Sequence, residues 1–224
     1  SNPTMGHEMM ASRRMEPRER KARILKAGEE LFSENGFVST TVDRIAERAG
    51  EAKGSIYYYF HSKGDLYLTI LLNASDAIVS EMERVAAQNL PAHEKVANIG
   101  KAYIRYLLEH PQYFRMLMFL QQGESRKAIS DGLLNELNDK ARLGLKIVSD
   151  AIQAGIEQGV LARTHPWRAA KIMLAMWNGI IHLALAEQAL RGKRIEVGHF
   201  AELPFDLLNN GLIQRQSAVS SERR

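Results

Sequence analysis

The chain of 224 residues contains no cysteine. This absence excludes disulfide bonds, thiolate nucleophiles and metal sites with cysteine ligands. The sequence also lacks the common motifs of catalysis: it has no nucleophile elbow, no glycine-rich phosphate loop and no HExxH zinc motif. The seven histidines are spread out, and none forms a recognisable pattern with a carboxylate. We therefore expect no metal site and no cofactor, and an enzyme is the weaker functional hypothesis.

Strand patterns and internal repeats are missing as well. Apolar residues instead recur at steps of three and four along most of the chain, and prolines and glycines interrupt this pattern between segments. The pattern predicts an all-α protein of about nine helices. A composition of 45% apolar and 25% charged residues is ordinary for a soluble globular protein. The formal net charge of +4 is compatible with DNA binding but does not demonstrate it.

Helix boundaries follow from capping residues and breakers. Gly36 and Gly50 suit the left-handed position that ends the first two helices. Thr40 and Ser62 are expected N-caps, because each has an acidic residue three positions later, the spacing of a capping box. The expected helices cover residues 17–35, 41–49, 53–59, 63–85, 93–109, 112–120, 126–158 and 166–190, with a last helix at about 200–214.

The segment 166–190 is apolar nearly all round, with only three charged residues. Its longest uncharged run, 172–186, is too short for a membrane span and contains Asn178 and His182. An apolar helix of this kind must be covered on more than one side. We therefore expect a homodimer in which this helix and the one at about 200–214 pack against the partner's. No signal-peptide pattern is present, so a cytoplasmic protein without a membrane partner is expected.

The stretch from 40 to 63 reads as two short helices joined by a tight turn. Ile56 and Phe60, four residues apart, direct one side of the second helix inward. Ser55 and three consecutive tyrosines then remain for a partner, and the lysines on either side make nucleic acid a plausible one. Helix-turn-helix pairs also occur in proteins that never bind DNA, and tyrosine clusters are often half-buried. Spacing alone leaves both interpretations open.

The residues themselves carry a resemblance. The run from Arg23 to Leu66 contains ILKAGEELFSENGF, TTVDRIAERAG, KGSIYYYF and SKGDL. It closely resembles the DNA-binding domain of the TetR family of transcriptional regulators, and the later helices resemble that family in architecture only. The resemblance implies a homodimeric repressor that binds a palindromic operator and senses a small molecule. The implied parts are a tail at 1–15, a DNA-binding domain at 16–64, a ligand-binding and dimerisation domain at 65–216 and a frayed tail at 217–224.

The resemblance also implies the DNA contacts. The second helix of the motif would enter the major groove, with Ser55 and Tyr57 at base edges. Lys53 would lie at its N-terminus, where the helix dipole favours a phosphate. Gly54 would leave room for close approach, and the remaining side chains would hold phosphates. The implied contact residues are Thr41, Arg44, Lys53, Gly54, Ser55, Tyr57, Tyr58 and Lys63.

Three residues depart from the family pattern. Glu51 stands where the family commonly has an apolar residue, so its carboxylate either tunes DNA affinity or points away. Ala52 stands where serine or threonine is frequent. Gly28 replaces the more usual alanine at a cost of about 1 kcal/mol, which close packing against another helix would explain. The run 13–26 carries seven basic residues against two acidic ones, and both a solvated helix face and a phosphate-contacting arm remain open.

The effector site is expected among the helices between 63 and 190. The candidate lining residues are large side chains at helical spacing, which are individually more typical of core packing. Asn178 and His182, four residues apart on an apolar helix, are the best polar anchors. An apolar or amphipathic effector would act through the short helix at 112–120. The candidates are Tyr103, Tyr106, Phe114, Met118, Met173, Met176, Trp177, Asn178 and His182. A helical adaptor that binds only protein remains the alternative to a DNA-binding regulator.

Overall fold

The computed structural model describes residues 16–121 and 129–191. Within these ranges the chain forms eight α-helices and no strand, as the sequence predicts, while the expected helix at 200–214 lies outside the described residues. The helices are α1 (Pro17–Ser39), α2 (Val42–Ala49), α3 (Lys53–Tyr59), α4 (Lys63–Ala86), α5 (Ala92–Glu109), α6 (Pro111–Gln121), α7 (Asp131–Glu157) and α8 (Pro166–Arg191).

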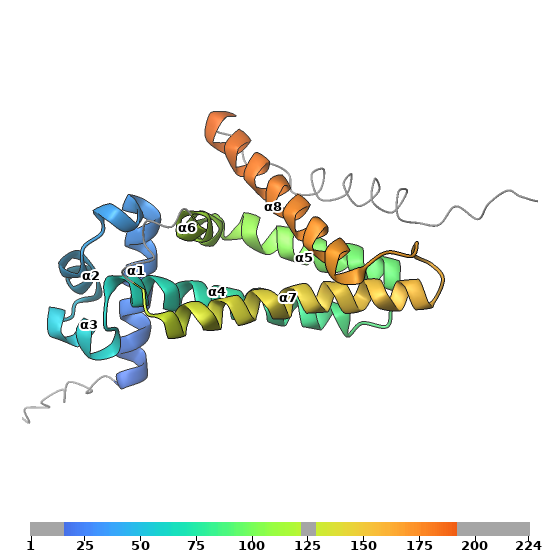
Figure 1. The fold of residues 1–224 in the computed structure, drawn as a ribbon. Helices are drawn as coiled ribbons and strands as arrows, with labels where there is room; N and C mark the ends of the chain where they lie inside the picture. Colours follow the sequence, from blue (N-terminus) through green and yellow to red (C-terminus); the bar gives the residue numbers. More distant parts are fainter. Residues whose placement is uncertain (1–15, 122–128, 192–224) are drawn as a thin grey trace, which may run out of the picture.

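The helices form two groups that α4 connects. In Figure 1, α1, α2 and α3 gather at one end, and α4 runs out of this group alongside α7. Helices α5 and α8 pack onto α4 and α7, and α6 lies between the two groups. One hydrophobic core joins α1–α3 to the first half of α4 as far as Leu72, and a second begins at Val79. The first turns of α4 therefore pack with the N-terminal group, whereas the sequence places the domain boundary at 64/65.

Gly50 ends α2 as expected, whereas Gly36 interrupts α1 without ending it. Gly36 has φ 74° and puts a kink into α1, which then continues to Ser39. Gly50 is left-handed (φ 63°, ψ 38°), and its N–H bonds to the carbonyl oxygens of Ala46 and Glu47. Any residue other than glycine would be strained at both positions, because positive φ brings its Cβ atom close to the backbone.

The expected N-cap of α2 is wrong by one residue. Thr41, not Thr40, accepts a hydrogen bond from the N–H of Arg44 (3.3 Å). Thr40 is fully buried, and its hydroxyl donates to the carbonyl oxygen of Gly36 (2.7 Å), where it closes the end of α1. The expected start of α7 at 126 is also wrong, because the helix begins at Asp131. At Ser62 the prediction is confirmed: its side chain accepts from the N–H of the third residue of α4 (2.9 Å).

Gly28 marks the closest approach of α1 and α4. A Cβ atom built there would lie 2.5 Å from Cδ2 of Leu66, which is fully buried. The close packing that the sequence suggested is therefore present, and it accounts for a glycine in the middle of a helix. The packing fixes how α4 leaves the N-terminal group.

Helix α8 is buried on one side only. Its inner residues are Ala170, Met173, Trp177, Ile181 and Ala184. On the other side Ile172 is 67% exposed, and Leu183 and Leu190 are exposed too. Among the described helices, α8 is the one long and apolar enough to cross a bilayer by length and composition, a test that core helices also pass. The described residues thus cover only one side of the apolar surface that the sequence assigns to this helix.

Candidate DNA-binding helix and ligand cavity

Helix α3 holds its apolar side inward and exposes Tyr57 and Tyr58, while Tyr59 is half-buried against the core. Ile56 and Phe60 are buried in the first core, as expected. Tyr57 and Tyr58 are 48% and 81% exposed, and the ring of Tyr58 packs edge-on against that of Tyr59 at 5.0 Å. A helix of seven residues is not stable alone, so the packing of Ile56 and Phe60 is what keeps the exposed aromatic face in place.

The N-terminal turn of α3 is open to a partner. A Cβ atom at Gly54 would meet no atom within 4 Å, so nothing inside the described chain requires glycine there. Ser55 beside it is half-buried. Lys53 is exposed and pairs with Asp43 of α2 at 2.9 Å, which raises the pKa of Lys53 through the hydrogen bond and the charge. An exposed ion pair of this kind contributes little and exchanges readily.

Helix α2 adds two expected contacts to the same surface. Thr41 is exposed, and as the N-cap it uses a hydroxyl lone pair while its O–H proton stays available to an acceptor. The side chain of Arg44 is exposed; its charge helps to lower the pKa of Glu34, but it makes no side-chain hydrogen bond or close ion pair with the described residues. Both side chains can therefore reach a phosphate without breaking an internal contact.

Lys63, an expected phosphate contact, has its ammonium group bound within the chain. Its ammonium group donates to the carbonyl oxygens of Phe37 (2.7 Å) and Thr40 (2.8 Å) and lies 4.3 Å from the centroid of the Phe37 ring. Partial burial lowers the pKa of Lys63. The side chain joins the start of α4 to the end of α1 and to Thr40 after it, so it helps to position the motif.

Glu51 is paired with two arginines of α1. Its carboxylate lies 2.6 Å from Arg23 Nη2 and 3.3 Å from Arg20 Nε, and its side chain is only 9% exposed. This pairing neutralises the carboxylate locally, and both interpretations of Glu51 remain predictions. Two cations of the run 13–26 are occupied by this contact, which ties α1 to the turn before α3.

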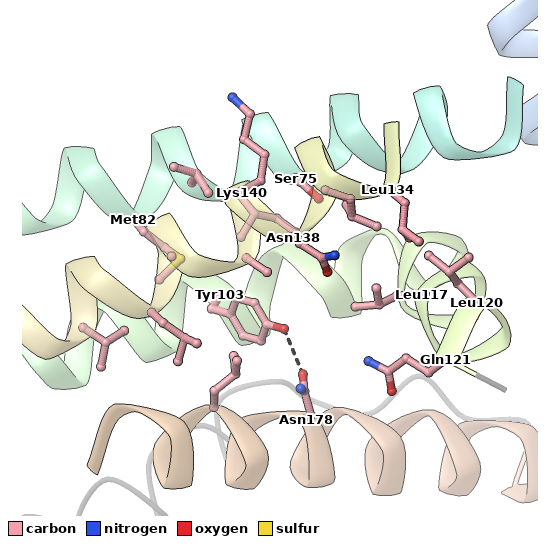
Figure 2. Close-up of a pocket in the computed structure, with 18 residues that line it drawn as sticks. Ser75, Met82, Tyr103, Leu117, Leu120, Gln121, Leu134, Asn138, Lys140 and Asn178 are labelled. Atoms are coloured by element: carbon pink, nitrogen blue, oxygen red, sulfur yellow. Dashed lines mark hydrogen bonds between the residues drawn. The ribbon is translucent and has the colours of Figure 1, made fainter. Parts of the chain in front are cut away.

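A cavity of about 430 Å³ lies among α4, α5, α6, α7 and α8. Its wall is mostly aliphatic, with contributions from Met82, Leu117 and Leu174. Tyr103 and Asn178, both expected at the effector site, line it, and the Tyr103 hydroxyl donates to Asn178 Oδ1 at 2.8 Å (Figure 2). Burial raises the pKa of Tyr103, so the phenol stays protonated. The volume suits a small organic ligand.

The other expected lining residues lie elsewhere. Trp177, Met173 and Phe114 are buried in the core, and His182 is exposed on the outer side of α8. Three half-buried residues, Tyr106, Met118 and Met176, also do not line this cavity. What the sequence analysis missed is the contribution of α4 and α7, including Ser75, Asn138 and Gly144. In the described part of the chain no cluster of three acidic or histidine side chains is placed to hold a metal.

Helix α6 contacts both the cavity and the N-terminal group. Leu117 and Leu120 line the cavity. On its other side, the Met116 carbonyl accepts a hydrogen bond from the Tyr67 hydroxyl (2.9 Å), and the Phe119 ring lies 5.6 Å from that of Phe37. A ligand that displaces α6 would therefore disturb its contacts with α1 and α4.

Comparisons with known proteins agree with this arrangement. A family model described as "Bacterial regulatory proteins, tetR family" matches residues 24–70, and one described as "Tetracyclin repressor-like, C-terminal domain" matches residues 96–203. The HTH-type transcriptional regulator RutR of Escherichia coli is 31% identical over 169 residues, which cover 74% of each chain. The chain belongs to the TetR family. Like other members, it is a ligand-responsive, DNA-binding transcriptional regulator and not an enzyme.

Further TetR-family proteins are more distant. The fatty acid metabolism regulator protein of Bacillus subtilis is 24% identical over 84% of this chain and 93% of its own. Among solved structures, PfmR from Thermus thermophilus superposes with a TM-score of 0.71 at 23% identity, over 86% of this chain and 100% of its own. FadR from Bacillus subtilis, in complex with stearoyl-CoA, superposes with a TM-score of 0.69 at 20% identity, over 85% of this chain and 98% of its own. At these identities the structures support the fold alone.

Proposed function

We propose that this protein is a cytoplasmic, homodimeric repressor that binds a palindromic operator and is released by an apolar or amphipathic effector. Helix α3 enters the major groove, with Ser55 and Tyr57 at base edges and Lys53 and Tyr58 at phosphates. Thr41 and Arg44 add phosphate contacts from α2, because both are exposed and free to reach the backbone. Lys63 holds the motif in shape.

The half-covered helix α8 supports the dimer. Three of the seven large apolar side chains that are exposed in the described residues lie on α8. A second copy related by a two-fold axis would cover them, together with the segment 200–214 that lies outside the described residues. The α3 helices of the two subunits would then lie at a spacing that can match successive major grooves, roughly 34–36 Å apart.

The observation that carries effector release is the position of α6. One side of this helix lines the cavity and the other bonds to the N-terminal group through Tyr67 and Glu29. An effector that binds better when α6 is displaced would shift the population toward a spacing of the α3 helices unfit for DNA. The bound stearoyl-CoA of the FadR structure supports a ligand with an apolar part.

Light scattering on the full chain tests the dimer. Wild type should show twice the monomer mass at micromolar concentration, and Ile172→Glu should reduce that mass and weaken operator binding. Leu143→Glu, at an exposed apolar position of α7, serves as the matched control and should leave both unchanged. A monomer mass for wild type would refute the proposed dimer.

A further inference from the structure

We infer that the cavity takes an uncharged, mainly apolar molecule carrying a carbonyl oxygen, and that the side-chain amide of Asn178 binds this oxygen. The inference rests on the proposed role of the cavity as the effector site and specifies the chemical class of the ligand. It follows from which hydrogen-bonding groups the cavity leaves open and from the charges on its wall.

Asn178 presents a donor to the cavity. The single proton of the Tyr103 hydroxyl is donated to Asn178 Oδ1 at 2.8 Å, so the oxygen of this amide is already used. Its Nδ2 group makes no hydrogen bond with the described residues, and most of the other side chains that line the cavity with Asn178 are aliphatic, such as Leu117 and Leu174. An apolar ligand with no acceptor would displace water and leave this N–H group unpaired, which costs free energy. A carbonyl oxygen would satisfy it.

The wall offers no compensation for a charged ligand. Lys140 is the one charged side chain among the described lining residues, and its ammonium group is already paired with the carboxylate of Asp76. In Figure 2 the Lys140 side chain extends away from Tyr103 and Asn178. A carboxylate or phosphate beside Asn178 would thus lose its hydration without gaining a cation. An ammonium group would also lose its hydration without compensation, because no carboxylate belongs to the described wall.

Three neutral groups reinforce the polarity of this end of the cavity. Asn138 and Gln121 are carboxamides, and burial keeps the Tyr103 phenol protonated by raising its pKa. The two carboxamides can donate or accept a hydrogen bond, the Tyr103 oxygen can still accept one, and none of the three carries charge at neutral pH. The site is therefore built to distinguish ligands by hydrogen bonding and shape.

Titration calorimetry of the full-length protein at pH 8 tests the inference with two probes that share one alkyl chain, 2-undecanone and decanoate. The ketone places a methyl group where the ionised acid has its second oxygen. We expect 2-undecanone to bind about tenfold tighter or more, because the carboxylate must be desolvated. Asn178→Leu should weaken ketone binding about 3- to 10-fold. Tyr103→Phe, which keeps the Asn178 amide, should retain the preference for the ketone.

A cavity-filling variant separates the possible failures. Gly144→Leu projects a side chain from α7 into the cavity, where the nearest atom to a new Cβ is Met82 Sδ at 3.8 Å. If decanoate binds as tightly as 2-undecanone or more tightly, and Gly144→Leu abolishes this binding, the inference is overturned but the cavity remains the effector site. Absence of ketone binding to wild type would also overturn it. Binding of both probes that survives Gly144→Leu would instead refute the cavity as the effector site.

Discussion

Gln112 of α6 donates a hydrogen bond from Nε2 to Oε1 of Glu29 in α1, across 3.0 Å. The two residues are 83 positions apart in the chain and belong to different helix groups. Tyr113 beside them has its pKa raised, first by burial and then by the Glu29 carboxylate. This contact is a direct polar link between the helix that lines the cavity and the N-terminal group that carries α3.

We predict that Gln112→Leu reduces the coupling between effector and operator while sparing each binding event alone. Loss of a contact on the coupling route is expected to change the coupling by about 0.5–2 kcal/mol. The measurement is operator affinity with and without saturating effector, in the variant and in wild type. Gln153→Leu, which removes a surface hydrogen bond within α7, is the control and should leave the coupling intact. Full coupling in the Gln112 variant would show that this contact is dispensable.

Gly54→Ala should stabilise the fold and weaken DNA binding. Alanine in a helix is favoured over glycine by about 0.5–1 kcal/mol, and the added methyl group has open space in the free protein. On DNA the same methyl group would stand between α3 and the groove. Gly132→Ala provides a matched control, because that glycine also has open space but lies in α7. Thermal melts should rise for both variants, whereas only Gly54→Ala should lose operator affinity. Unchanged operator affinity would mean that the DNA does not approach Gly54.

Opposite changes are expected at the two ends of the Lys53–Asp43 ion pair. Lys53→Ala should remove one phosphate contact, weaken binding to all DNA sequences alike and lower the slope of log affinity against log salt by about one unit. Asp43→Asn should strengthen binding, because Lys53 no longer has a competing carboxylate at 2.9 Å. Gel-shift titrations at several salt concentrations measure both effects. Tyr58→Phe should also weaken binding if its hydroxyl holds a phosphate. If Lys53→Ala and Tyr58→Phe each bound the operator with wild-type affinity, the placement of α3 in the DNA groove would be wrong.

Ala52 is the N-cap of α3 and supplies no side-chain hydrogen bond. Ala52→Ser should therefore raise stability by about 1 kcal/mol, since serine can accept a hydrogen bond from a free N–H of the first turn. Denaturant unfolding monitors the change. Ala87→Ser, at the C-terminal end of α4, places the same side chain where no N-cap exists and should not stabilise. An equal gain at both positions would point to a cause other than capping.

The N-terminal group could be predicted nearly to the residue because its signals are local. The bounds of α3 follow from Gly50 before it, Ile56 within it and Phe60 just after it, and the structure confirms them. The N-cap of α2 was missed because consecutive threonines offer the same chemistry at 40 and 41. Which of them is buried depends on the path of the chain after the kink at Gly36, and spacing does not encode that path.

The cavity could be predicted only in part, for a physical reason. Helix α8 is apolar on all sides, so the sequence does not indicate which residues face the core, the cavity or a partner. Trp177 and Asn178 are neighbours, yet the first is buried in the core and the second lines the cavity. Space between helices also depends on small residues such as Gly144 of α7, which carry no chemical signal of their own.

The central claim is that effector and operator compete through one conformational equilibrium. The most direct measurement is the affinity of the full-length protein for 2-undecanone with and without an operator selected from random-sequence duplexes, alongside operator affinity with and without the ketone. Linkage requires both affinities to fall by the same factor, which we expect to be roughly 5- to 150-fold for a coupling of about 1–3 kcal/mol. Equal ketone affinities in the presence and absence of operator, for binding that Gly144→Leu abolishes, would contradict the account.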